Sequence, residues 1–124
     1  MHKLFLLAGS ISGMLSVMIG AFGAHALKAT LEATNRLETF ETAVKYQFYH
    51  SLALILLGIL MVQFQNKAFN VSGYGFIVGI IIFSGSLYAL SLTGITKFGA
   101  ITPVGGLALI LGWAALAWGI FKTV

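Results

Sequence analysis

Four long runs without a charged side chain constrain this sequence more than any other feature. The runs are Leu4–Ala24, Tyr46–Phe64, Gly73–Leu92 and Pro103–Phe121. Each is about 20 residues long, and at about 1.5 Å per residue a helix of that length crosses a hydrocarbon core of about 30 Å. Lipid offers backbone N–H and C=O groups no partners, so runs of this kind form helices. The sequence therefore predicts an all-α integral membrane protein, a single four-transmembrane-helix bundle over residues 1–124.

The composition excludes two other classes of protein. Of the 124 residues, 59% are apolar and 8% are charged, whereas an ordinary soluble domain is about 45–50% apolar and about 25% charged. A chain this short would expose a large apolar surface to water, and intrinsic disorder requires low hydrophobicity and high charge. The absence of cysteine leaves no disulfide framework and no thiolate metal site.

The first run also has some features of a secretory signal. Met1-His2-Lys3 precedes an apolar stretch, and Ala24-His25-Ala26 is similar to a small-residue cleavage site. The uncharged run is longer than the about 7–15 residues of a signal h-region. We therefore expect it to remain as the first span.

Most of the charge lies in Leu27–Lys45, between the first two runs. This short segment holds six of the ten charged residues. Apolar residues recur in it at spacings of three and four, which predicts an amphipathic helix at the membrane interface and then a polar first turn of the second span. A docking surface for a partner outside the membrane is the alternative.

Local signals predict how this segment is capped and paired. Glu32–Arg36 and Glu41–Lys45 have the acid-first i,i+4 order that favours ion pairs on a helix. Asn35, followed three residues later by a glutamate, is typical of a helix N-cap.

The start of the fourth span carries a cap signal of its own. Pro103 stands where a helix tolerates the missing N–H of its first residue. Thr102 is then the predicted N-cap.

Small residues recur at four-residue spacing inside the spans. Such ladders let helix backbones approach closely where lipid supplies no hydrophobic drive between helices. We expect most of them to pack the four helices together, with contact to another copy of the chain as the alternative. The predicted helix-packing glycines are Gly9, Gly13, Gly20, Gly75, Gly79, Gly85, Gly105, Gly106 and Gly112.

Known chemical motifs are sparse. No span contains Asp or Glu, so the carboxylate relays of many pumps are missing. The sequence has no nucleotide-binding glycine loop, no HExxH and no Gly-x-Ser-x-Gly element. Its net charge of +4 suits an anionic membrane surface and does not argue for nucleic acid. Trp113, Trp118, Tyr46 and Tyr49 are interpreted as lipid-facing or interfacial aromatics. We expect no catalytic residues, no enzyme activity and no cofactor.

Histidine remains the strongest polar signal. His25 ends the first run and His50 lies inside the second, which predicts that both lie near one membrane face. Tyr46 and Gln47 share a helix face with His50, and Ser51 flanks it. An unpaired imidazole is costly to bury in a membrane, so hydrogen bonds that join the first two helices are the favoured interpretation. Two imidazoles that bind a metal or haem iron are the alternative.

Four motifs resemble one family along the whole chain. They are Gly20-Ala21-Phe22-Gly23-Ala24-His25, Thr42-Ala43 with Tyr46-Gln47-x-x-His50, Phe83-Ser84-Gly85-Ser86-Leu87-Tyr88, and Thr102-Pro103-x-Gly105-Gly106 with Gly112-Trp113. Together they are similar to the small bacterial YgdD/YwdK membrane proteins, which are related to mammalian transmembrane protein 256. The resemblance implies a multi-pass, four-helix protein of the bacterial cytoplasmic membrane. The family is a domain of unknown function, so it implies no reaction, substrate or catalytic residue.

The matched positions suggest one polar cluster at one end of the bundle. Its predicted members are His25, Tyr46, Gln47, His50, Ser84, Ser86, Tyr88 and Thr102.

Three function classes follow from the sequence. The favoured class is a non-catalytic packing, assembly or lipid-contacting unit whose partners are membrane lipids and, as a further expectation, other copies of the chain. The alternative is a small transporter or channel, which requires a homo-oligomer because four helices enclose little space. The third is a metal or haem protein that uses His25 and His50. Three positive residues on one side of the membrane and four on the other leave the orientation open.

Overall fold

The computed structural model describes residues 1–124 and contains four helical spans. They are His2–His25, Leu37–Gln63, Lys67–Thr93 and Thr96–Thr123, all long and apolar enough to cross a membrane. The elements in chain order are α1 (His2–His25), α2 (Lys28–Ala33), α3 (Leu37–Gln63), α4 (Lys67–Gly79), the π-helix η1 (Ile80–Ser84), α5 (Gly85–Thr93), the 3-10 helix η2 (Thr96–Ala100) and α6 (Thr102–Thr123). The predicted all-α, four-helix membrane architecture is confirmed.

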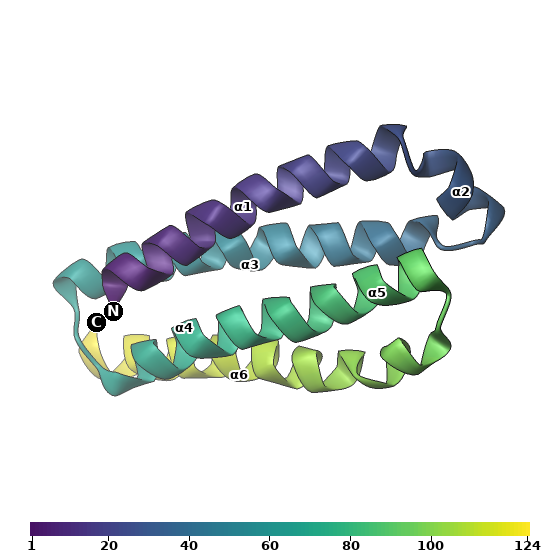
Figure 1. The fold of residues 1–124 in the computed structure, drawn as a ribbon. Coiled ribbons are helices and arrows are strands. Elements are labelled where there is room, and N and C mark those ends of the chain that lie inside the picture. Colours follow the sequence, from purple (N-terminus) through teal and green to yellow (C-terminus); the bar gives the residue numbers. More distant parts are fainter.

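The spans form two hairpins that meet along α3. In one hairpin α1 packs on α3, and in the other α4 packs on α6. The third span contacts α3 through α4, η1 and α5. Figure 1 shows both chain termini at one end of the molecule and α2 at the other. Helix α3 therefore holds the two hairpins together.

A π-helix interrupts the third span. In η1 (Ile80–Ser84) the N–H of Gly85 bonds back to the carbonyl of Ile80, five residues earlier. The extra residue in this turn shifts the helical register, so that α4 and α5 present differently phased faces to α3. Turns of this type are frequent at functional sites, and nothing in the sequence analysis predicted this one.

The apolar core lies where the two hairpins meet. Phe5 of α1 reaches across to α4, where its ring lies against Gly73 and makes an edge contact with Tyr74 at 5.4 Å between ring centroids. Phe69 and Phe76 of α4 lie against the glycines of α6 in the same way, and all three phenylalanines are fully buried. Aromatic rings packed on glycines thus fasten the end of the molecule that carries the termini.

The second and third spans begin before their uncharged runs. Helix α3 starts at Leu37, nine residues before Tyr46, which agrees with the predicted polar first turn of the second span. The third span starts at Lys67, because the Asn66 side chain caps it by accepting a hydrogen bond from the Ala68 N–H at 2.8 Å. Charged and polar residues therefore extend these helices beyond the uncharged runs.

The predicted N-cap at Asn35 is wrong. Asn35 has a φ of 56°, the left-handed conformation that Asn tolerates better than most residues. Its N–H bonds to the Glu32 carbonyl and the Arg36 N–H bonds to the Leu31 carbonyl, which is the Schellman pattern that ends a helix. Asn35 therefore closes α2, and Arg36 occupies the N-cap position of α3 without a side-chain cap.

Other local predictions in this region also fail. Neither Glu32–Arg36 nor Glu41–Lys45 forms an ion pair; the one pair within 4.0 Å is Lys28–Glu32. The turn at Asn35 takes Arg36 out of helical register with Glu32, which explains the first failure. Thr102 is not an N-cap either, since Ile101 holds that position and Thr102 is the first residue of α6.

Most of the predicted packing glycines lie at close contacts within the chain. A Cβ atom at Gly9 would approach the Ser51 carbonyl oxygen of α3 to 2.7 Å, and one at Gly75 would approach the Gly112 backbone of α6 to 3.1 Å. A Cβ at Gly105 would overlap with the Phe83 backbone inside η1. Gly85 departs from the prediction, because a Cβ there meets nothing within 4 Å.

Adjacent glycines in α6 provide a test of this packing. Gly105→Ala forces the Phe83 backbone to move and should destabilise the protein by about 1–3 kcal/mol. Gly106→Ala meets only the Phe83 ring at 3.8 Å and should be neutral, or stabilising by about 0.5–1 kcal/mol because a helix favours Ala. The free energy of unfolding in mixed micelles of a mild detergent and SDS measures both changes. Equal effects of the two variants would contradict the close approach at Gly105.

Candidate functional site

The largest polar network in the membrane centres on Gln47, which is 6% exposed. Its Nε2 donates to the Ser12 carbonyl oxygen at 3.1 Å and approaches Ser12 Oγ at 3.4 Å. Its Oε1 accepts a 2.6 Å hydrogen bond from the Tyr88 hydroxyl. Ser51 joins the network, with its Oγ 2.7 Å from Ser12 Oγ and 2.6 Å from the Gln47 carbonyl oxygen. This Gln47 network (Ser12, Gln47, Ser51 and Tyr88) joins α1, α3 and α5.

His50 has a different set of partners. Its Nδ1 lies 2.7 Å from the Tyr46 carbonyl oxygen, and its Nε2 lies 3.0 Å from Trp113 Nε1 of α6. A carbonyl can only accept and an indole N–H can only donate. His50 is therefore the neutral tautomer with its proton on Nδ1, and both ring nitrogens are occupied.

Two further polar contacts join the remaining helices. The Ser84 hydroxyl, inside η1, donates to the Ala43 carbonyl oxygen of α3 at 2.7 Å. Ser86 and Thr102 share a 2.6 Å hydrogen bond between α5 and α6. Each of these hydrogen bonds gives a hydroxyl group a partner within the protein, which lipid cannot provide.

The residues of the predicted cluster fall into several separate groups. Gln47 and Tyr88 are together, as are Ser86 and Thr102, while Ser84 bonds only to backbone. Tyr46 is 39% exposed and contributes its carbonyl oxygen to His50. His25 lies exposed at the end of α1, and its ring makes no hydrogen bond.

The predicted roles of His25 and His50 in joining the first two helices are therefore not found. His50 lies near the middle of α3, about 20 Å along the helix from its start at Leu37 at 1.5 Å per residue. The two histidines do not lie near one membrane face, and His50 joins α3 to α6 rather than to α1. Ligation of a metal or haem iron by His50 would require loss of the Trp113 hydrogen bond.

The sequence analysis missed some members of these groups. It treated Trp113 as a lipid-facing aromatic, although its indole N–H is the partner of His50. Ser12 was not among the predicted members of the polar cluster either. No pattern in one sequence pairs residues 35 or 63 positions apart, so these contacts could not be predicted from periodicity.

A groove open to the side of the molecule runs between α1 and the third span, and we call it the lateral groove. Its outer part, about 470 Å³, lies toward α2, and its inner part, about 320 Å³, lies toward the middle of the helices. The outer part is lined by Leu15, Met18, Ile19, Phe22, Leu27, Phe40, Tyr88 and Leu92, and the inner part by Ala8, Ile11, Ser12, Leu15, Gln47, Leu54, Ile77, Ile80 and Ile81. Both parts have α1 on one side and the third span on the other.

The Gln47 network crosses the floor of the lateral groove. Tyr88 lines the outer part and Gln47 the inner part, so their 2.6 Å hydrogen bond marks the boundary between the two. Volumes of this size fall within the about 300–1,000 Å³ of typical ligand sites, which are apolar with a few placed polar groups. The lateral groove has that composition.

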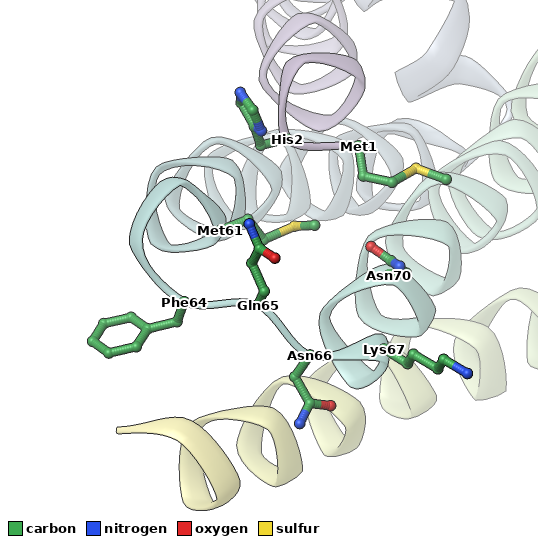
Figure 2. Close-up of a pocket in the computed structure, with 8 residues that line it drawn as sticks. All are labelled: Met1, His2, Met61, Phe64, Gln65, Asn66, Lys67 and Asn70. Atoms are coloured by element: carbon green, nitrogen blue, oxygen red, sulfur yellow. The ribbon is translucent and has the colours of Figure 1, made fainter.

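A second hollow, of about 460 Å³, lies at the end of the molecule that carries the termini. Figure 2 shows its lining, from the start of α1, the end of α3 and the start of α4. The Gln65 and Asn70 amides face the hollow, whereas the His2 ring and the Lys67 ammonium group point away from it in different directions. No set of charged groups converges there, and the lateral groove is the better candidate site.

Comparison with known sequences places the chain in a family. Residues 19–106 match the family described as "Protein of unknown function (DUF423)". The chain is 44% identical to a UPF0382 membrane protein of Staphylococcus haemolyticus over 98% of each chain, and 40% identical to the UPF0382 membrane protein YwdK of Bacillus subtilis over 90% of each. A UPF0382 membrane protein of Haemophilus influenzae is 37% identical over 99% of this chain and 98% of its own.

The chain belongs to the DUF423 family. The predicted resemblance to the YwdK proteins is confirmed, and the names of the relatives agree with a multi-pass membrane protein. No solved structure matches the chain. The family is uncharacterised and carries no enzymatic name, so the site of this DUF423 protein has to be interpreted from its own geometry.

A double-mutant cycle tests the central bond of the Gln47 network. Gln47→Leu and Tyr88→Phe each remove one partner of the 2.6 Å contact. We expect a coupling energy between about 0.6 kcal/mol, the average for hydrogen bonds between membrane helices, and about 1.7 kcal/mol, the largest found. The free energy of unfolding of the two single variants and the double variant gives this value. Additive effects would show that the bond does not form.

The tautomer of His50 is a second prediction. We expect ¹⁵N NMR in nanodiscs to show a protonated Nδ1 and an unprotonated Nε2. Trp113→Phe removes the indole donor and should shift the Nε2 resonance, whereas Trp118→Phe, on the same helix, should not. An Nε2-protonated ring in the unsubstituted protein would contradict the hydrogen-bond assignment.

Proposed function

We propose that this DUF423 protein is a non-catalytic, lipid-contacting membrane protein that holds an apolar chain in its lateral groove. The observation that carries the proposal is the opening between α1 and the third span, with apolar walls and the Gln47 network on its floor. In a bilayer, lipid tails surround such an opening.

The arrangement of the helices supports a lasting opening. Helix α1 is fastened to α4 near the termini, where Phe5 lies against Gly73 and the Tyr74 hydroxyl approaches Met1 Sδ at 3.3 Å. Toward α2, helix α1 packs on α3, and the lateral groove lies between α1 and α5. The two walls therefore belong to different hairpins, and they are joined by the Phe5 contact near the termini and by the floor.

The chemistry of the groove supports an apolar occupant that makes few hydrogen bonds. All eight residues around the outer part are apolar or aromatic. Gln47 uses its amide group within the network, since Nε2 donates to Ser12 and Oε1 accepts from Tyr88. The Gln47 amide on the floor is therefore hydrogen-bonded within the protein, so a hydrocarbon chain can cover it.

The same observations give no support to a catalytic function. None of the spans contains a carboxylate in its uncharged run, and no group of three or more metal-ligating side chains occurs. Association of several copies is compatible with the lipid-contacting function and remains a separate proposal, for which exposed apolar faces of α1 and α6 are available.

Blocking the groove tests the proposed function. Ile11 lines the inner part of the groove and is exposed, so Ile11→Trp should fill it without displacing the core. Leu107→Trp adds the same ring to an exposed position of α6 that lies outside the groove. We expect native mass spectrometry from mild detergent to show bound phospholipid on the unsubstituted protein and on Leu107→Trp, and severalfold less on Ile11→Trp.

Two outcomes would contradict the proposal. One is an unsubstituted protein that retains no lipid under conditions in which it stays folded. The other is equal loss of lipid from both variants, which would mean that the lipid coats the apolar surface without entering the groove.

A further inference from the structure

The one arginine of the chain lies at the α2 end of the molecule without a partner. Arg36 is half-buried, yet its guanidinium group forms no ion pair and no side-chain hydrogen bond. The nearest carboxylate in the sequence pattern, Glu32, pairs with Lys28 instead. Five N–H donors of Arg36 are therefore free to bind a group from outside the chain.

The backbone around Arg36 directs its side chain toward α5. The Schellman turn at Asn35 ends α2, and the Arg36 N–H bonds to the Leu31 carbonyl. From there the side chain reaches the end of α5, where Nη2 lies 4.0 Å from the position that a Cβ of Gly94 would occupy. Gly94 has a φ of 72° and ends α5, so no side chain at that position covers the guanidinium group.

This location adjoins the outer part of the lateral groove. Leu92 lines the groove two residues before Gly94, and Phe40 lines it one helical turn after Arg36. The ring of Phe40 packs on Tyr88 at 5.4 Å between centroids. The Arg36 side chain thus extends from the start of α3, the helix under the groove, to the end of α5, which forms one wall. This is the end of the groove near most of the charged residues.

We propose that Arg36 binds the phosphate group of a phospholipid whose acyl chain occupies the lateral groove. This inference rests on the proposed function of the groove. A guanidinium group matches a phosphate because its planar N–H donors bind two oxygens at once. An apolar groove that ends at an unpaired cation fits a molecule with a hydrocarbon chain and an anionic head.

The charges nearby favour the same ligand. Glu38 and Glu41 of α3 are exposed and form no ion pair with Arg36, and Glu32 pairs with Lys28. Lys97 lies in η2, which begins two residues after Gly94, and is exposed. No carboxylate therefore competes with a phosphate for Arg36.

A comparison of two lipids with identical acyl chains tests the proposal. The probes are phosphatidylglycerol and the corresponding diacylglycerol, which lacks the phosphate. In native mass spectrometry the unsubstituted protein should retain phosphatidylglycerol with about tenfold preference, the size expected for a charge-assisted hydrogen bond. Arg36→Gln should abolish the preference while still retaining both lipids.

Matched variants separate the site from general charge. Lys97→Gln removes one positive charge from the same end of the molecule and should leave the preference unchanged. Arg36→Lys keeps the charge without the two-pronged geometry and should retain only part of the preference. Because the Arg36 side chain makes no bond within the protein, these variants should unfold at the same temperature as the unsubstituted protein.

The outcomes distinguish this inference from the proposed function. Equal retention of the two lipids by the unsubstituted protein, or a preference that survives in Arg36→Gln, overturns the role of Arg36 and leaves the groove intact. Retention of neither lipid overturns both. Saturable stabilisation of the protein against thermal unfolding by glycerol 3-phosphate alone would assign Arg36 to a free phosphate ester. That result would also overturn the lipid assignment.

Discussion

Inside a bilayer a polar group depends on partners within the chain, and in this protein most of the side-chain hydrogen bonds between helices involve α3. The Ala43 carbonyl oxygen accepts a hydrogen bond from the Ser84 hydroxyl, and the His50 ring accepts one from the Trp113 indole. The Gln47 amide is hydrogen-bonded to both Ser12 and Tyr88. These bonds reach η1, α1, α5 and α6 from successive turns of one helix. Since lipid offers no alternative partner, they determine which face of each helix turns toward α3. The two hairpins are positioned relative to each other by this helix.

The groove is a consequence of the same arrangement. Phe5 and Gly73 fasten α1 to α4 at the end that carries the termini, but no comparable contact joins α1 to α5. The π-helix η1 and the turn after it place Ser84 and Tyr88 against α3, so α5 packs on α3 and forms the wall of the groove opposite α1. An opening with apolar walls and a satisfied polar floor follows, and Arg36 stands unpaired near its charged end. A lipid-contacting function accounts for all three features.

The parts of this structure that could be predicted are those that depend on a short stretch of sequence. Uncharged runs predict spans, because the bilayer imposes one length and one type of secondary structure. Gln47, Tyr88, Ser86 and Thr102 could be identified as polar residues within spans, because each is costly to leave unpaired. Their actual hydrogen-bond partners could not be predicted, because pairing depends on how each helix is rotated about its axis. The π-helix changes that rotation, and no signal in the sequence indicates it. The failed cap at Asn35 has a similar cause, since Asn suits both the start of a helix and the left-handed residue that ends one.

The central claim is that lipid, not protein, separates α1 from α5, and NMR in lipid nanodiscs tests it most directly. With methyl-labelled protein and protonated lipid, the account predicts nuclear Overhauser effects from acyl-chain methylenes to Leu15 and Ile80, which line the groove. It also predicts none between Met18 and Leu92, on opposite walls. Direct contacts between Met18 and Leu92, with no acyl-chain signal at Leu15 and Ile80, would show that the groove closes in the membrane and would contradict the account.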